Sequence, residues 1–236
     1  MRNSLVVIGL GETGFPLFNI LRETYPDAYG YDLRRSIGVA PDETDVLHIC
    51  LPYVGLEERF VEVCKTYTTK FNSSHVVVHT TVPVGVTSQI PNAVHSPILG
   101  RHSTMERDLR SYTKWIGGRE ELTQHVADHL ERAHFNTRQV KTSEETEVLK
   151  LLCLAKYGVS LAFANLQFAI CDMYGVSQDH IIDWDINYNQ SVLPSLQRPI
   201  ITPTHGKIGG HCVIPGTRIL NDQFPNPLLA EVLKYA

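Results

Sequence analysis

The sequence predicts an α/β fold: a doubly wound parallel sheet, followed by a smaller helical domain that contains one long helix. Over roughly the first 140 residues, short β-branched runs alternate with segments of helical periodicity, as in parallel sheets with crossover helices. Near-continuous hydrophobicity in Leu5–Ile8 and Val76–Val78 is typical of strands covered on both faces. An apolar helical stripe beginning near Thr142 predicts the long helix. We therefore expect domains at residues 1–141 and 142–236.

The elements of the first domain are expected where apolar runs are bounded by turn residues. In chain order they are a strand at Ser4–Gly9, a helix at Thr13–Thr24, strands at Ala28–Asp32 and Val46–Leu51, a helix at Leu56–Lys70, strands at Val76–Thr80, Ala93–His95 and Trp115–Ile116, and a helix at Glu120–Ala133.

The second domain begins with a capping box, Thr142 followed by Glu145, and its long helix ends at Tyr174-Gly175. A helix of about 30 residues is ~45 Å long, which exceeds the diameter of one small domain. We therefore expect it to bridge the two halves or to pack against its copy, and we predict a homodimer through residues 143–174. Further helices are expected at Gln178–Tyr188 and from Leu228.

Composition excludes several classes of function. The net charge of −4 without a basic block gives no reason to expect nucleic acid or an anionic membrane as a partner. No stretch approaches the ~18 apolar residues that a membrane span needs. The five cysteines are odd in number and scattered, which favours reduced thiols and a cytoplasmic location.

A glycine motif lies between the first predicted strand and helix. Gly9, Gly11 and Gly14 form Gly-x-Gly-x-x-Gly, and Asp32 ends the next predicted strand. This context is the fingerprint of a Rossmann-type dinucleotide site, in which the helix N-terminus binds the phosphates. A glycine turn without any ligand is the alternative. An acid at this position favours NAD, but Arg34 and Arg35 could instead meet the 2′-phosphate of NADP, which we rank as the less favoured cofactor.

Two side chains in the second half suggest chemistry. Cys212 follows Gly209-Gly210-His211, and a histidine beside a cysteine favours the nucleophilic thiolate. A small buried residue in a turn is an equally good interpretation. Lys150 is either a solvent-facing helix residue or a group that stabilises an oxyanion or takes a proton. No metal site is predicted, because His205, His211 and Cys212 lack a second pair at ligand spacing.

Several motifs together resemble one family. They are Gly9–Leu17, Cys50-Leu51-Pro52, Thr80–Thr87, Ser96-Pro97, Gly117-Gly118, Glu147–Leu151 with Ala162–Asn165, and Gly209–Pro215. The chain resembles the UDP-glucose/GDP-mannose dehydrogenase family, thinly over most of its length. The resemblance implies a two-step, NAD-dependent oxidation of a nucleotide sugar's primary alcohol to the acid. It implies Cys212 as nucleophile, Lys150 as alkoxide stabiliser, and Thr81 as a residue that places water and cofactor.

The candidate site residues are therefore of two kinds. The catalytic candidates are Cys212, Lys150 and Thr81. The cofactor-binding candidates are Gly9, Leu10, Gly11, Thr13, Gly14, Asp32, Leu33, Arg34, Leu51, Pro52 and Thr81.

The chain departs from the family at three positions. The family's glutamate, asparagine and aspartate are replaced by Ile98, Leu154 and Gly216. An isoleucine cannot transfer a proton and a leucine cannot hold an oxyanion. His102 is a speculative replacement base. The family's C-terminal nucleotide-binding domain has no counterpart in these 236 residues, so we expect a truncated, divergent member.

Three hypotheses follow. The first is an NAD-dependent dehydrogenase that acts on the alcohol of a sugar-like substrate. The second is a catalytically impaired, dinucleotide-binding dimer that serves as a sensor or partner subunit. The third is a β-hydroxyacid dehydrogenase, ranked last because that family places a glycine-rich loop before its lysine, whereas Thr142–Leu149 contains no glycine.

Overall fold

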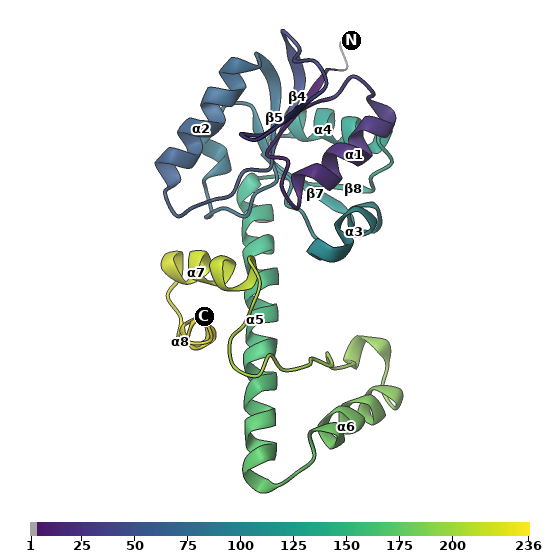
Figure 1. Cartoon of the computed structure of the whole chain (residues 1–236), viewed down its shortest axis with the longest axis vertical. Coiled ribbons are helices and arrows are strands. Elements are labelled where there is room, and N and C mark those ends of the chain that lie inside the picture. The colour runs from purple at the N-terminus through teal and green to yellow at the C-terminus, as the bar shows by residue number, and fades with distance from the viewer. Residues whose placement is uncertain (1–3) are drawn as a thin grey trace. The chain divides into compact units, whose positions relative to one another are not determined.

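The computed structural model describes residues 4–236, which form two compact units (Figure 1). The first unit runs to Lys150 and the second is Leu151–Ala236. The division falls within the long helix, whose first residues belong to the first unit. Each unit is described by itself.

The first unit contains all the strands of the described chain. They are β1 (Leu5–Ile8), β2 (Tyr29–Tyr31), β3 (Ser36–Ile37), β4 (Thr44–Ile49), β5 (Ser73–Val78), β6 (Ala93–His95), β7 (Lys114–Gly117) and β8 (Thr137–Val140). The helices of the whole described chain are α1 (Gly14–Thr24), α2 (Glu57–Lys70), α3 (Met105–Ser111), α4 (Glu120–Arg132), α5 (Ser143–Tyr174), α6 (Gln178–Gln190), α7 (Val213–Gln223) and α8 (Pro227–Leu233).

The strands form one sheet in the order β3-β2-β1-β4-β5-β6-β7-β8. Neighbouring strands are parallel except at β2–β3 and β6–β7, which are antiparallel. Successive side chains of β1 point to opposite faces of the sheet, so the core has two layers. Leu5 and Val7 pack with α1, α3 and α4, while Val6 and Ile8 pack with α2 on the other face (Figure 1). The predicted Rossmann-type α/β fold is confirmed.

The connections of β1 and β4 run in opposite directions across the sheet. From β1 the chain crosses through α1 to β2 on one side, and from β4 it crosses through α2 to β5 on the other. In open α/β sheets this arrangement opens a crevice at the carboxyl ends of the two strands, where ligands bind. A ligand site is therefore expected at the carboxyl ends of β1 and β4.

Four elements were not predicted, and each has a weak local signal. The strand β3 has two residues, and β8 carries the partly exposed run Thr137–Val140. The helix α3 has only seven residues. The helix α7 begins directly after Cys212 and contains Pro215, which is tolerated because it lies in the first turn.

The long helix α5 has 32 residues, as its sequence predicts. Its capping box forms: the Thr142 N–H donates to the Glu145 carboxylate at 3.1 Å, and the Glu145 N–H donates to the Thr142 hydroxyl at 3.4 Å. In the second unit, a Cβ on Gly158 would lie 2.8 Å from Val232 and 3.1 Å from Val213. The absence of a side chain there lets α7 and α8 pack closely on α5. No helix among the described residues is long and apolar enough to cross a membrane.

Candidate functional site

The predicted cofactor residues of the first unit follow the carboxyl ends of four neighbouring strands. Since β2, β1, β4 and β5 are parallel, these ends share one edge of the sheet. The residues at this edge are Gly9–Gly14 after β1, Asp32–Arg34 after β2, Leu51 and Pro52 after β4, and Thr81 after β5. Thr80 ties two of these loops together, because its hydroxyl donates to the Leu51 carbonyl at 2.6 Å.

The three glycines of the loop have different reasons to lack a side chain. Gly9 has a φ of +88°, and a Cβ there would lie 2.7 Å from the Cys50 carbonyl oxygen. A Cβ on Gly14 would lie 1.9 Å from the Gly9 carbonyl oxygen. A Cβ on Gly11 would meet no heavy atom of the described chain within 4 Å. Packing therefore requires Gly9 and Gly14, whereas Gly11 leaves open space beside the N-terminus of α1.

Asp32 is anchored to the same loop. Its carboxylate accepts hydrogen bonds from the Leu10 N–H at 2.9 Å and from the Arg34 N–H at 3.3 Å. Arg35 donates to the Leu10 carbonyl at 2.9 Å, and its guanidinium lies 4.2 Å from the Phe15 ring centroid. A carboxylate accepts about four hydrogen bonds, so Asp32 retains capacity for the hydroxyl groups of a ribose.

His102 also lies at the glycine loop. Its Nδ1 is 2.5 Å from a carboxylate oxygen of Glu12, the residue after Gly11. The histidine that sequence reasoning offered as a replacement base is therefore paired with a residue of the proposed phosphate-binding loop.

Lys150 is partly buried, and its ammonium donates to the Ile98 carbonyl at 2.9 Å. The side chain of Ile98 is 6% exposed and packs in the core with Met105 and Leu109. The side chain of Ile98 is thus part of the hydrophobic core, and its backbone oxygen contacts the candidate catalytic lysine.

Glu147, one turn before Lys150, holds the loop that contains Thr81. Its carboxylate is fully buried and accepts from the Gly85 N–H at 2.7 Å and the Thr87 N–H at 2.9 Å. Burial raises the pKa of Glu147, and the N–H donors act in the opposite direction. In the sequence Glu147 appears only as part of the Glu147–Leu151 motif; an acid in an otherwise apolar helix stripe is the signal for a buried anchor.

Cys212 belongs to the second unit, where it is exposed and directly precedes α7. Gly209 and Gly210 before it are also exposed, and Gly210 has a φ of +89°. A helix N-terminus stabilises negative charge on a nearby atom. The exposure of Cys212 argues against a side chain that serves only to fill the core.

Leu154 and Gly216 contact each other. A Cβ on Gly216 would lie 2.5 Å from Cδ1 of Leu154, and both residues are buried. The leucine occupies the space that any side chain at position 216 would need. The two residues therefore form one packed arrangement between α5 and α7.

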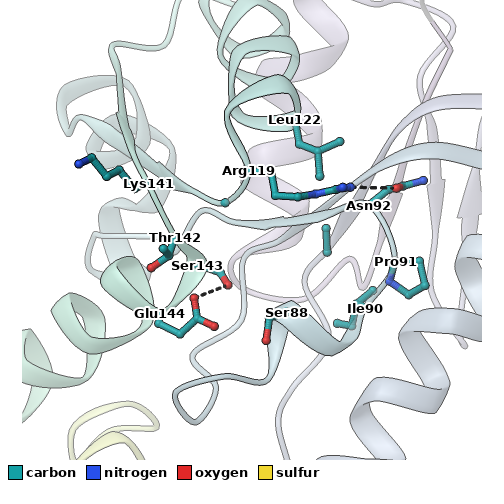
Figure 2. A pocket seen from close by; sticks show the side chains of 12 residues that line it. Ser88, Ile90, Pro91, Asn92, Arg119, Leu122, Lys141, Thr142, Ser143 and Glu144 are labelled. Atoms are coloured by element: carbon teal, nitrogen blue, oxygen red, sulfur yellow. Dashed lines mark hydrogen bonds between the residues drawn. The ribbon is translucent and has the colours of Figure 1, made fainter.

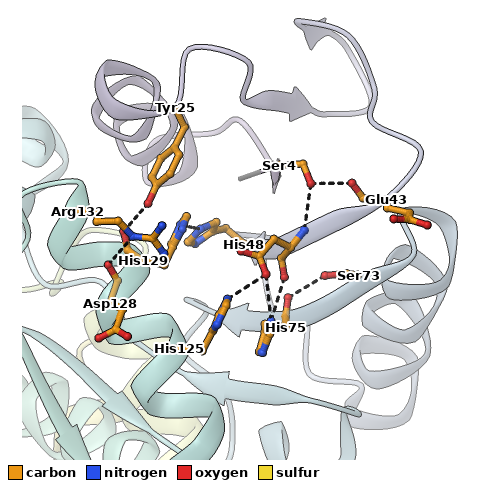
Figure 3. A network of polar contacts seen from close by, with 11 residues as sticks. Ser4, Tyr25, Glu43, His48, Ser73, His75, His125, Asp128, His129 and Arg132 are labelled. Atoms are coloured by element: carbon orange, nitrogen blue, oxygen red, sulfur yellow. Dashed lines mark hydrogen bonds and ion pairs between the residues drawn. The ribbon is translucent and has the colours of Figure 1, made fainter. Parts of the chain in front are cut away.

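A cluster outside the predicted site contains Asp45, His75 and His125. Figure 3 labels the two histidines. The Asp45 carboxylate lies 3.5 Å from His75 Nδ1 and 3.0 Å from His125 Nε2. The two imidazole rings are stacked, with centroids 3.8 Å apart and planes at 8°. Nitrogen lone pairs lie in the ring planes, so those of two parallel rings do not converge on one ion. His75 Nδ1 forms its hydrogen bond with the Asp45 backbone carbonyl at 3.2 Å, and only His125 forms one with the carboxylate, so we do not identify the cluster as a metal centre.

A pocket of about 400 Å³ lies at another part of the first unit (Figure 2). Ser88, Asn92, Arg119 and Glu144 are among its lining residues, and Arg119 donates to Asn92 at 3.5 Å. None of the predicted site residues lines this pocket, so we do not assign it to the candidate site.

The sheet order and the glycine loop define the class of this chain: a Rossmann-type fold of the kind found in dehydrogenases. A scan against protein-family models and a search of curated proteins return no match. Among solved structures, the chain is similar to a UDP-D-ManNAc dehydrogenase from Pyrococcus horikoshii, with a TM-score of 0.81 and 19% identity over 98% of this chain and 68% of that one.

Two further structures are similar. A GDP-mannose dehydrogenase from Pseudomonas aeruginosa gives a TM-score of 0.66 and 19% identity over 99% of this chain and 68% of that one. A 3-hydroxyisobutyrate dehydrogenase from Mycobacterium tuberculosis gives 0.73 and 16% identity over 99% of this chain and 92% of that one. At these identities the comparisons establish a shared fold.

Proposed function

We propose that this chain is an NAD-dependent oxidoreductase that oxidises an alcohol group of a sugar-like substrate, with Cys212 as the nucleophile. The observation that carries the proposal is the glycine loop. Gly11 faces open space that no described side chain or backbone atom fills, at a helix N-terminus and beside an anchored acid. This is the space that a dinucleotide pyrophosphate requires.

The residues present fit the cofactor. The N-terminal amides of α1 would bind the phosphates and Asp32 would accept from the adenosine ribose hydroxyls. A nicotinamide dinucleotide supplies a hydride acceptor when bound. Lys150, held by the Ile98 carbonyl, would stabilise the alkoxide of the substrate. The Cys212 thiolate would add to the resulting aldehyde, and the thioester left by a second oxidation would be hydrolysed by water.

Binding and turnover test this proposal separately. We expect NAD to raise the unfolding temperature more than NADP does, since ligand binding stabilises by RT ln(1 + [L]/Kd). We expect NADH formation with members of a UDP-sugar panel. Cys212→Ser is expected to abolish acid formation, while Cys153→Ser, which removes another exposed thiol, leaves it unchanged. Binding of NAD without turnover on any substrate would instead support a sensor or partner subunit.

A β-hydroxyacid dehydrogenase is the second candidate. The structure of the 3-hydroxyisobutyrate dehydrogenase is matched over 92% of its length, more than the sugar-nucleotide dehydrogenases are. Oxidation of an alcohol to a carbonyl needs a hydride acceptor and a base, and no thiol. Turnover of 3-hydroxyisobutyrate that survives Cys212→Ser but not Lys150→Met would favour this candidate.

We also propose that the chain is a homodimer through α5. Four apolar residues of α5 in the second unit follow helical spacing on one face and remain 47–77% exposed: Phe163, Leu166, Ile170 and Met173. A contiguous exposed apolar face marks an interaction site. Light scattering is expected to give twice the chain mass, and Phe163→Glu is expected to give the monomer. A monomeric wild-type protein at all tested concentrations would contradict this assignment.

A further inference from the structure

Three histidines and a lysine form a continuous buried row in the first unit. They are His129 on α4, His48 on β4, His79 directly after β5 and Lys114 on β7, each 4% exposed or less. His129 Nε2 lies 3.1 Å from His48 Nε2, and His48 Nδ1 lies 2.9 Å from His79 Nε2. Lys114 Nζ lies 3.2 Å from His79 Nδ1. Figure 3 shows the His129 and His48 end of the row.

The surroundings keep the three imidazoles neutral. Burial lowers the pKa of His48, His79 and His129, and for His129 it lowers the value to about 3. A neutral imidazole has one N–H donor and one acceptor nitrogen. Each ring in the row can therefore donate at one nitrogen only, and its neighbours must match that choice.

Lys114 sets this choice at one end. Its Nζ has three contacts: the Ser96 carbonyl at 2.8 Å, the Pro97 carbonyl at 3.2 Å and His79 Nδ1 at 3.2 Å. An ammonium carries three hydrogens. All three find acceptors only if His79 Nδ1 is unprotonated. His79 Nε2–H must then donate to His48 Nδ1, and His48 Nε2–H must donate to His129 Nε2.

A neutral amine at Lys114 permits the opposite arrangement. Its two hydrogens bind the two carbonyls, and His79 Nδ1–H donates to the Ser96 carbonyl, which lies 2.6 Å away. His48 Nδ1–H then donates to His79 Nε2, and His129 Nε2–H donates to His48 Nε2. The 2.6 Å distance between His79 Nδ1 and the Ser96 carbonyl oxygen matches this state. An unprotonated Nδ1 would be a second acceptor facing the carbonyl, and two acceptors would repel at that distance.

We propose that the row is a proton relay between Lys114 and His129, in which deprotonation of the Lys114 ammonium reverses every hydrogen bond along it. The Lys114 proton passes to His79 Nδ1, that of His79 Nε2 to His48 Nδ1, and that of His48 Nε2 to His129 Nε2. The proton of His129 Nδ1 then leaves for water. One proton enters, one leaves, and every ring stays neutral.

The charges around the row place the switch near neutral pH. Burial, assisted by the charge of Lys150, lowers the pKa of Lys114 to about 7. Burial also raises the pKa of the Cys50 thiol to about 12, so Cys50 stays neutral.

The row also has an aromatic and an acidic group near it. The Tyr25 ring stacks on that of His129 with centroids 4.7 Å apart, and the Asp45 carboxylate pairs with His75 and His125. The other titratable neighbours are cations and imidazoles. His95 acts on the pKa of His79, while Arg132, His125 and His75 act on that of His129. All of them lower these values, which keeps the imidazoles of the row neutral while Lys114 titrates. At one end of the row, Lys114 donates to the Ser96 and Pro97 carbonyls. The next carbonyl along the chain, that of Ile98, accepts from Lys150.

Long-range ¹H–¹⁵N spectra of the histidine rings test the relay in the resting protein, without substrate. Between about pH 6 and about pH 8, we expect the proton of each ring, in His79, His48 and His129, to move from one ring nitrogen to the other. The three tautomer changes should share one midpoint pH. At the higher pH, the proton should lie on Nδ1 of His79 and His48 and on Nε2 of His129. Fixed tautomers across this range, or separate midpoints, would overturn the proposal.

Two variants locate the coupling. Lys114→Met removes the amine and should lock all three rings in the high-pH arrangement. His48→Phe interrupts the row, so His79 should still switch while His129 no longer does. A His129 that continues to switch in His48→Phe would refute the relay. Since the wild-type spectra decide the question alone, failure of a variant to fold leaves the test intact. The outcome is independent of NAD binding and turnover.

Discussion

Replacing single glycines of the loop with alanine should separate stability from cofactor binding. Gly14→Ala places a methyl group 1.9 Å from the Gly9 carbonyl oxygen and 2.8 Å from Cβ of Cys50. Ordinary C···O contacts begin at about 3.3 Å, so the backbone must move by more than about 1 Å. Overpacking of a tight core costs ~1–3 kcal/mol and occasionally more. We expect about 3 kcal/mol, which lowers Tm by roughly 6–12 °C in a chain of this size.

Gly11→Ala should behave in the opposite way. The new methyl group meets no described atom within 4 Å, and the position has no positive φ. The change in the free energy of unfolding should stay within about 1 kcal/mol, since alanine also restricts the unfolded chain. The methyl group would, however, occupy the space assigned to the pyrophosphate. NAD at 100 times its Kd adds about 2.7 kcal/mol to the wild type, and this gain should disappear.

Urea denaturation and thermal melts, each with and without NAD, measure both quantities. A Gly14→Ala protein as stable as the wild type would contradict the described packing. A Gly11→Ala protein that retains the full stabilisation by NAD would show that the open space at Gly11 has no role in binding.

Three further predictions concern buried positions. Glu147→Leu leaves two loop N–H groups without acceptors and should lower the free energy of unfolding by about 2–4 kcal/mol in urea denaturation. Glu147→Gln is the control; if Glu147→Leu loses no more stability than this variant, the carboxylate does not anchor the loop. Leu154→Ala should cost about 2–5 kcal/mol and Gly216→Ala about 1–3 kcal/mol. The double variant should cost less than the sum by about 0.5–3 kcal/mol, because each change relieves the other; strict additivity would show that the two sites do not touch. The folded-state pKa of Lys114, about 7, lies below its ordinary value of 10.5, so the unfolded chain binds more protons between these values. The free energy of unfolding should therefore rise with pH above about 7, by up to about 1.4 kcal/mol per pH unit from this group. Lys114→Met should flatten that rise, and an unchanged slope in denaturation at several pH values would contradict the lowered pKa.

The sequence predicted the parts of the fold whose signals are local. The first strand, the glycine loop and α1 are adjacent in the chain, and the capping box of α5 spans four residues. The helix α7 was missed because Pro215 follows the Gly-Gly turn so closely that the segment resembles a continued loop. The strand β8 was missed because an exposed edge strand needs few apolar residues.

The buried row could not be predicted because its members are distant in sequence. His48 interrupts an apolar run, and His79 follows the end of another. Only the parallel register of β4 and β5, which pairs His48 with Val77, brings their side chains together on one face. The available signal is a polar residue at matching positions of adjacent apolar strands. It becomes useful once the strand order is known.

The contact between Leu154 and Gly216 constrains how this site can be rebuilt. A carboxylate introduced at position 216 alone would meet Cδ1 of Leu154 before it reached any substrate. An asparagine at position 154 has the same branching and as many side-chain heavy atoms as leucine, so it would leave the position beside residue 216 filled. Introducing both polar groups therefore also requires the backbone of α7 to move away from α5 at this contact.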